Sequence, residues 1–271
     1  MMCAIDLHIH TTASDGMLSP SEIVGMADQF GVNVIAVTDH DTVSGIPEAL
    51  QAASATSVRV IPGVEISAEW DGVQAHLLGY HVDYAAPVFV DGLEKFAATR
   101  MDRARCIMEK LHGLGMSLSW EHLCGEGQAG AIGRPHIARL MMQEGHVASV
   151  EEAFGRYLSP GQKAFVPRAK ITPAEAIAMI HEAGGQAVLA HPWSVVFLLS
   201  PLVSEGLDGL EVFYRDYDAC QQRRLASLAR EHGLLCTGGS DYHGPGPDVL
   251  PLGGVRVPVE CVAEMDARRA L

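Results

Sequence analysis

The 271-residue sequence lacks the features that mark membrane-embedded, secreted and disulfide-stapled proteins. No apolar stretch approaches the length of a membrane span, and no basic region followed by a long apolar run opens the chain. The six cysteines form no C-x-x-C pair, and a chain of this size does not depend on disulfides. We therefore expect reduced thiols and a cytoplasmic protein.

Positive charge is also scarce, since 19 lysines and arginines stand against 33 aspartates and glutamates. The resulting net charge of −14 argues against duplex nucleic acid or an anionic membrane surface as the main partner. We see no internal repeat, no low-complexity linker and no feature that indicates an obligate protein partner.

What the sequence does contain is an alternation of strand and helix patterns. Ser19 and Glu22 form a capping-box pair that opens one helix, and Thr172 and Glu175 repeat the pattern later. Strands are expected near residues 3–9, 33–38, 58–65, 74–80, 186–190, 207–213 and 234–238. About seven strands separated by helices predict an α/β fold with a parallel barrel or sheet.

The alternation stops between residues 87 and 159. Helical patterns occupy 94–114, 134–145 and 150–158, with no convincing strand between them. We therefore expect two domains: a barrel formed by 1–86 and 160–271, and a helical insert at 87–159 that covers the active site.

Histidines and carboxylates follow the predicted strands. Parallel α/β barrels place their chemistry at the carboxyl ends of the strands, so these scattered residues should meet in space. They are His8, His10, Asp15, His40, Glu65, His76, His191, Asp241 and His243. Any one of them alone would be read as an ordinary core or surface residue. Together, imidazoles and carboxylates without thiolate indicate a centre for manganese, iron or zinc.

The motifs around these residues resemble the PHP (polymerase and histidinol phosphatase) superfamily of metal-dependent phosphoesterases. They are D-L-H-I-H-T-T-A-S-D-G at 6–16, T-D-H-D at 38–41, G-V-E at 63–65, H-L-L-G-Y at 76–80, A-H-P at 190–192 and S-D-Y-H at 240–243. The resemblance implies a distorted (β/α)7 barrel holding three divalent ions, with Mn2+ favoured and Fe2+ or Zn2+ as alternatives.

By the same resemblance the nine ligands divide among the three ions. One ion would take His8, His10, Glu65 and Asp241; a second Glu65, His76 and His191; a third Asp15, His40 and His243. Such ions lower the pKa of a bound water, so a metal-bound hydroxide is expected to attack phosphorus. Asp39 beside His40 would either orient that imidazole or cap the following turn.

Two other classes remain as alternatives. Amidohydrolase barrels also begin with H-x-H, but those with two metals use a carbamylated lysine as a bridge. This chain has only four lysines, none of which follows an apolar strand among the ligands, and Glu65 can take the bridging position. The other alternative is a catalytically inactive metal-binding module, which a complete ligand set disfavours.

Basic residues in and beside the insert predict an anionic substrate, because residues 134–170 carry a local charge of +3. Arg134 opens a helix whose first turn contains a proline, and a helix N-terminus beside a guanidinium is suited to phosphate. Arg100 and Arg103 lie one turn apart on a predicted helix and could form a second contact. His136 and Lys170 complete the expected substrate-binding set.

The stretch G-R-P-H-I-A-R-L at 133–140 resembles one branch of the superfamily, the 3′,5′-nucleoside bisphosphate phosphatases and related short-oligonucleotide 5′ to 3′ exonucleases. This resemblance implies removal of the 3′-phosphate from a bisphosphate such as pAp, with Arg134 holding the other phosphate. Histidinol phosphate is the alternative substrate, but its other end is cationic and would not need an anion site.

Overall fold

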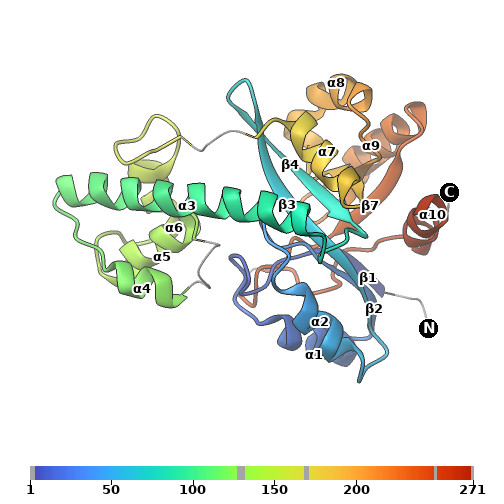
Figure 1. Ribbon diagram of the computed structural model, residues 1–271, viewed down its shortest axis with the longest axis horizontal. Helices are drawn as coiled ribbons and strands as arrows, with labels where there is room; N and C mark the ends of the chain where they lie inside the picture. The colour runs from blue at the N-terminus through green and yellow to red at the C-terminus, as the bar shows by residue number, and fades with distance from the viewer. Residues whose placement is uncertain (1–3, 127–131, 168–170, 247–248, 270–271) are drawn as a thin grey trace.

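The computed structural model describes residues 4–126, 132–167, 171–246 and 249–269. Within these residues a seven-stranded sheet, with its strands in sequence order, curves into a nearly closed barrel (Figure 1). Its strands are β1 (Ala4–Ile9), β2 (Val32–Val37), β3 (Arg59–Trp70), β4 (Val73–Tyr80), β5 (Gln186–Leu189), β6 (Gly209–Tyr214) and β7 (Leu235–Gly239). The predicted α/β barrel is confirmed.

The first and last strands close the barrel. Tyr242, just past β7, forms a parallel bridge with Ile9. The His10 amide donates to the Tyr242 carbonyl at 2.9 Å, and the Tyr242 amide donates to the His8 carbonyl at 3.2 Å. A Cβ atom on Gly239 would collide with the backbone nitrogen of His8, so this close approach requires glycine. The histidine motif near the start of the chain therefore lies against the aspartate motif near its end.

The parallel arrangement expected of the strands does not extend to β4. These two strands form an antiparallel hairpin, and β4 is antiparallel to β5 as well. Asp71 and Gly72 connect them with positive φ angles of 46° and 86°, as tight hairpin turns require. Because β4 runs against its neighbours, its first half lies at the rim where the parallel strands end. His76, expected at the end of a strand, lies inside β4 and still reaches that rim.

Helices pack around the barrel (Figure 1). They are α1 (Pro20–Phe30), α2 (Ile46–Ala53), α7 (Pro173–Glu182), the 3-10 helix η2 (Pro192–Leu198), α8 (Leu199–Ser204), α9 (Ala219–Glu231) and α10 (Val259–Arg269). Both predicted capping boxes are present, with Ser19 and Glu22 opening α1 and Thr172 and Glu175 opening α7. The reciprocal hydrogen bonds explain why these helices begin where the sequence indicated.

The segment after β4 is helical, and none of its described residues between 87 and 167 forms a strand. It contains α3 (Pro87–Gly113), α4 (Trp120–Glu126), α5 (Arg134–Gln143), α6 (Val150–Ala153) and the π-helical turn η1 (Phe154–Leu158). These elements enclose their own apolar cluster, which includes Leu111, Leu123 and Leu140. The cluster continues past residue 159 to Ala164, and Val166 packs against it.

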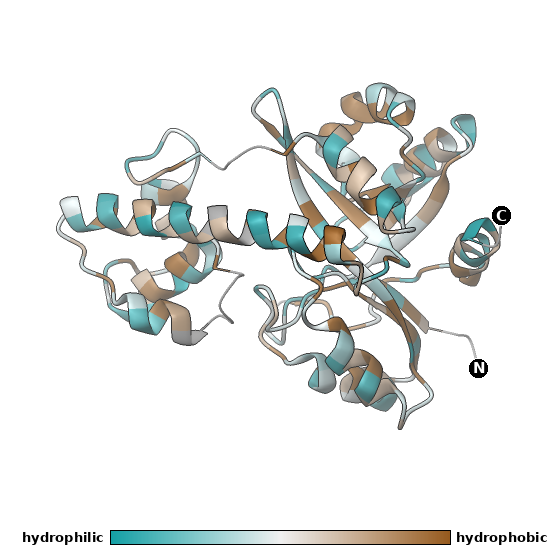
Figure 2. Cartoon of the chain, viewed as in Figure 1, coloured by the Kyte–Doolittle hydropathy of each residue, from teal (hydrophilic) through white to brown (hydrophobic). Residues whose placement is uncertain are grey.

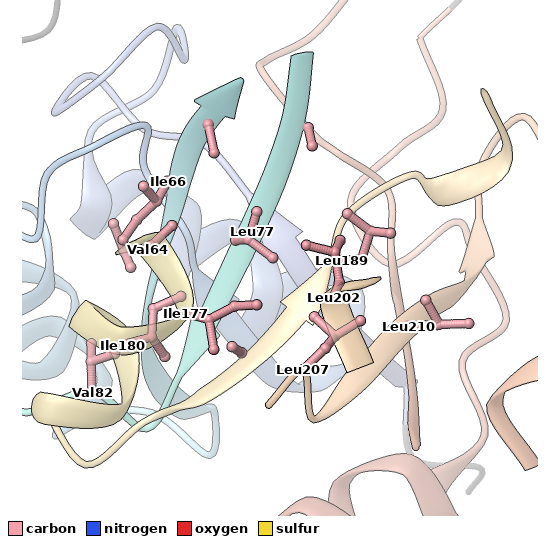
Figure 3. Packing of buried hydrophobic residues seen from close by; sticks show 14 of the residues in the cluster. Val64, Ile66, Leu77, Val82, Ile177, Ile180, Leu189, Leu202, Leu207 and Leu210 are labelled. Carbon is pink, nitrogen blue, oxygen red and sulfur yellow. The ribbon is translucent and has the colours of Figure 1, made fainter. Parts of the chain in front are cut away.

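The main barrel core lies between the sheet and its covering helices. Leu77, Leu189 and Leu210 on the strands share one buried cluster with Ile177 and Ile180 on α7 (Figure 3). Hydrophobic residues accordingly concentrate along the strands, whereas α3 alternates between hydrophobic and hydrophilic residues (Figure 2). This core fixes the strands whose ends carry the polar rim.

Helix α3 belongs to both cores. Phe89 and Leu93 near its start pack in the barrel cluster, whereas Ile107 and Leu111 near its end pack in the insert cluster. One continuous helix therefore connects the insert to the barrel (Figure 1). Neither α3 nor any other helix in the described part of the chain has the length and hydropathy needed to cross a membrane.

Candidate metal centre

The structure brings all nine expected ligands together at one rim of the barrel. They come from the ends of β1, β2, β5 and β7, from the middle of β3 and from the first half of β4. The six histidine rings form a connected group whose neighbouring centroids lie 4.1 to 6.3 Å apart. The buried carboxylate of Glu65 lies within this group, 2.9 Å from His76 Nδ1 and 3.2 Å from His191 Nε2.

Three sets of ligand atoms are close enough to hold an ion, with all atoms of a set within 4.8 Å of one another. The sets are His10, Asp15, His40 and His243; His8, His10 and Glu65; and His40, Glu65 and His76. Asp241 Oδ1 extends the second set, since it lies 3.1 Å from His10 Nε2. The three sets overlap at His10, His40 and Glu65, so the geometry is less strictly divided than the partition that the resemblance implied.

Two of these residues have an unusual backbone. His191 has φ 31° and Asp241 has φ 51°, both in the left-handed region that residues with a Cβ atom rarely occupy. Such conformations cost about 1 to 3 kcal/mol and persist where the surroundings enforce them. At His191 the backbone N–H donates to Glu211 Oε2 at 2.7 Å. Strained backbone at two candidate ligands is consistent with a functional site.

The surroundings of the His8 imidazole are those expected beside a bound cation. Its Nδ1 lies 2.9 Å from Glu211 Oε1, which assigns the proton of the neutral ring to that nitrogen. The opposite nitrogen, Nε2, is buried and has no hydrogen-bond partner among the described residues. It faces Glu65 Oε2 at 3.4 Å and Asp241 Oδ1 at 3.5 Å. A buried ring nitrogen with two carboxylate oxygens this near suits a divalent ion with nitrogen and oxygen ligands.

The electrostatics of the cluster also favour bound cations. Burial would lower the pKa of His8, but Glu211, Asp241 and Glu65 outweigh it and hold that pKa well above its ordinary value. Burial would also lower the pKa of His10, but hydrogen bonds to Asp241 and Glu65 outweigh it and raise that pKa to about 10. Burial would raise the pKa of Glu65, but His40, His76 and His8 hold it well below its ordinary value. The carboxylates therefore stay ionised and need positive charge beside them.

A second layer of carboxylates positions the ligands. Glu211 is fully buried and holds both the His8 ring and the His191 backbone. Asp39 accepts hydrogen bonds from the amide and hydroxyl of Thr11 and from the hydroxyl of Ser14. These bonds fix the loop that carries Asp15 toward the cluster, so Asp39 orders the loop that follows β1.

A pocket lies between the metal ligands and the insert. Asp15, His40 and His76 line one side of it, and Arg103 and Arg134 line the other. Each arginine also donates a hydrogen bond to a backbone carbonyl of the insert, at 2.8 Å for Arg103 and 3.2 Å for Arg134. Both guanidinium groups lie 5.9 Å from the centre of the Phe165 ring. The arginines thus share one ordered wall that faces the cluster.

Comparison with known proteins decides the family. The model of the PHP domain family matches residues 6–159. The chain belongs to the PHP family. It is 37% identical over 252 residues to the 5′-3′ exoribonuclease Rnm of Salmonella typhimurium, covering 89% of this chain and 86% of that protein. It is 32% identical over 255 residues to the 3′,5′-nucleoside bisphosphate phosphatase of Chromobacterium violaceum, covering 90% of this chain and 89% of that protein.

A solved structure agrees with the fold. A protein from Bifidobacterium adolescentis, assigned to the metal-dependent phosphoesterases, superposes with a TM-score of 0.89 at 31% identity. The superposition covers 99% of this chain and 97% of that structure. The likeness therefore includes the helical insert as well as the PHP barrel.

The other expected substrate-binding residues of this PHP protein are placed unequally. His136 is buried and accepts a hydrogen bond from the Gly133 amide at 3.1 Å, which caps α5. Arg100 belongs to α3, but its side chain lies outside the described structure. Lys170 is not among the described residues. Ser67 and Gln74 line the pocket and were not predicted. Their signal would have been the β3–β4 hairpin, which places both beside His76 at the rim.

Proposed function

We propose that this PHP protein removes the 3′-phosphate of a nucleoside 3′,5′-bisphosphate such as pAp, giving the 5′-mononucleotide and phosphate. We extend the proposal to cleavage of short 5′-phosphorylated oligonucleotides. Phosphoester hydrolysis is the chemistry supported jointly by the family, by the two named relatives and by the similar structure. The chain is accordingly a metal-dependent phosphoesterase, and the substrate is the finer part of the proposal.

The observation that carries the finer part is the pocket with metal ligands on one side and two arginines on the other. Arginine matches phosphate oxygens with two parallel N–H donors, so Arg103 and Arg134 favour an anionic group at the insert side. A substrate that fills both sides therefore carries two anionic groups. Histidinol phosphate would place its cationic end against these arginines and is disfavoured for that reason.

The nine ligands fit a cluster of divalent ions, for which Mn2+ is the favoured choice. Bound ions would supply a Lewis acid for the phosphate oxygens and acidify a bound water. The chain's own residues prepare the place for them: Glu65 and Asp241 stay ionised, and Glu211 orients His8. The Tyr214 hydroxyl donates to Asp241 Oδ2 at 2.9 Å, which leaves Oδ1 directed at His10.

The amidohydrolase alternative gains no support from this geometry. Lys95 and Lys110 lie on α3 and Lys163 follows η1, so none of the described lysines reaches the centre of the cluster. Glu65 occupies that central position, within 3.4 Å of a nitrogen of each of five histidines. Those histidines are His8, His10, His40, His76 and His191.

A substrate panel tests the proposal. The protein would be stripped with a chelator, reloaded with Mn2+ and assayed on pAp, 5′-AMP, 3′-AMP, histidinol phosphate and a 5′-phosphorylated dinucleotide. We expect the highest kcat/KM on pAp or the dinucleotide, with 5′-AMP as the product and no further hydrolysis of 5′-AMP. Equal or better turnover of histidinol phosphate would refute the substrate assignment.

A further inference from the structure

A row of aromatic side chains leads outward from the metal ligands. It lies on the part of the rim away from the insert pocket. The Tyr214 ring lies 5.7 Å from His191, the Tyr217 ring 5.1 Å from Tyr214, and the Trp193 ring 6.3 Å from Tyr217, all between centroids. We call Tyr214, Tyr217 and Trp193 the aromatic ladder. Its outermost member, Trp193, is 42% exposed, so a large apolar ring is presented to solvent beside the site.

Hydrogen bonds hold this ladder in place. The Trp193 amide donates to the Tyr217 hydroxyl at 2.9 Å, and the Tyr214 hydroxyl donates to Asp241. Tyr217 is half-buried, and its ring packs against the barrel core. The two tyrosine rings and the Trp193 backbone are therefore held beside the strand ends before anything binds, which reduces the entropy lost when a ligand packs against them.

The ladder and the insert pocket occupy different halves of the rim. The pocket is lined by the ends of β1 to β4 together with the insert, whereas the ladder follows β5 and β6. Since the strands lie in sequence order around the barrel, these are separate sectors. Figure 1 shows α4 to α6 of the insert and helix α9, which follows the ladder, on opposite sides of the barrel.

A cationic side chain accompanies the ladder. Arg215 donates a hydrogen bond to the backbone carbonyl of Asp241 at 3.2 Å, so its guanidinium lies next to a metal ligand. The same guanidinium lies 6.0 Å from the centre of the Tyr214 ring. An arginine beside aromatic rings on which bases can stack is the combination that proteins use to bind single-stranded nucleic acid without base preference.

The chemistry of the proposed function requires a site in this sector. In pAp, water adds to phosphorus, the bond from phosphorus to O3′ breaks, and O3′ takes a proton. In an oligonucleotide the same bond breaks, but phosphorus also carries the 5′-oxygen of the next nucleotide and stays attached to it. With the first nucleotide in the insert pocket, this next nucleotide has to leave the cluster on another side.

We propose that the aromatic ladder binds the nucleotide downstream of the scissile phosphate, with its base stacked on Trp193 and its backbone beside Arg215. The inference rests on the proposed function and names the part of the substrate that the function leaves unplaced. It makes the site one for single-stranded 5′-phosphorylated oligonucleotides, with pAp occupying only half of it.

Kinetics on pAp and on 5′-phosphorylated pApA test the ladder. Base stacking on an aromatic ring predicts that Trp193→Ala lowers kcat/KM for pApA by roughly 5- to 100-fold, mainly through KM. Turnover of pAp should not change, because pAp has no downstream base. Trp193→Phe should keep most of the activity on pApA. Phe197→Ala is the matched control, since Phe197 is an exposed ring of the same helix outside the ladder.

The outcomes separate the two proposals. Turnover of pAp by the wild type decides the proposed function, and the change in kcat/KM for pApA between wild type and Trp193→Ala decides the ladder. Equal activity of the two proteins on pApA would overturn the ladder while leaving the bisphosphatase intact. A parallel loss on both substrates would also overturn it, because Trp193 would then act on the fold or the metal centre.

Discussion

Glu211 and His8 are joined by a hydrogen bond of 2.9 Å in the interior of the barrel, where both side chains are fully buried. The second oxygen of the same carboxylate accepts from the His191 backbone N–H. One side chain thereby positions two candidate ligands from different strands. Carboxylates that orient ligand imidazoles in this way raise metal affinity without touching the metal.

Replacing Glu211 with glutamine tests this role. Glutamine has one oxygen where two acceptors are needed, so either His8 or His191 loses its partner. We expect the dissociation constant for Mn2+ to rise about 10- to 100-fold, measured by calorimetric titration of the metal-free protein. Glu205→Gln, at an exposed helix end, is the control. Unchanged affinity in Glu211→Gln would mean that other contacts orient the two histidines.

Removal of a central ligand should be more severe. His10 and Asp241 each belong to the densest part of the cluster, with His10 Nε2 3.1 Å from Asp241 Oδ1. We expect His10→Ala or Asp241→Ala to lose bound metal and turnover while circular dichroism stays close to that of the wild type. Elemental analysis of the active wild type provides the counter-test, because less than one ion per chain would contradict a multinuclear centre.

Arg134 separates bisphosphate recognition from general phosphatase activity. A charge-assisted contact with the remote phosphate contributes about 1.5 to 3 kcal/mol. Arg134→Ala should therefore lose about 10- to 100-fold in kcat/KM on pAp. Hydrolysis of 3′-AMP, which lacks the second phosphate, should change little.

The control for Arg134 is Arg156→Ala in the same insert, where the guanidinium is exposed and paired with Glu152. Equal losses by Arg134→Ala on pAp and 3′-AMP, together with a lower Tm, would instead assign Arg134 to the structure of the insert. Its contact with the Leu158 carbonyl and its position over the Phe154 ring make that outcome a definite alternative.

A surface ion pair offers a test of stability against pH. Arg59 on β3 donates two hydrogen bonds of 2.6 Å to Asp266 on α10, and this contact lowers the pKa of Asp266 below its ordinary value of 3.8. The pair is exposed, so Asp266→Asn should cost about 0.2 to 1 kcal/mol in the free energy of unfolding at neutral pH.

The sign of the pH effect follows from the lowered pKa of Asp266. The ionised carboxylate stabilises the fold above the unfolded-state pKa, and this contribution is lost as pH falls through the folded-state value. Urea unfolding of wild type and Asp266→Asn should therefore differ at pH 7 and converge below about pH 4. A difference that persists in acid would show that asparagine disturbs the packing of α10.

Much of the fold could be predicted because local signals agree with it. The mostly β-branched stretch at 33–38 and the capping pair Ser19 and Glu22 each act within a few residues, so sequence alone locates them. The direction of β4 was missed because the pairing of strands is a long-range property. One local signal was available, since Asp71 and Gly72 form the dipeptide that favours a tight hairpin.

In the candidate site, too, residues with local sequence signals could be predicted and those that depend on long-range contacts could not. The nine polar residues follow recognisable strand patterns, so the sequence could place them on one rim. Glu211 and Tyr214 could not be found in this way, because they lie within β6 and act through partners about 20 to 200 positions away. The first four residues of β6 are all buried, so burial along the strand does not identify what these two side chains face.

The length of helix α3 determines which of its sides faces the pocket. An α-helix turns by about 100° per residue and rises 1.5 Å, so the sector of α3 that Arg103 occupies is set by the number of residues after Phe89 and Leu93. Deleting or adding a single residue between the two anchoring regions would rotate the whole insert about the helix axis and carry Arg103 out of the pocket. A change of length in a loop would be absorbed locally. A change of length in α3 would instead alter the orientation of the insert relative to the barrel.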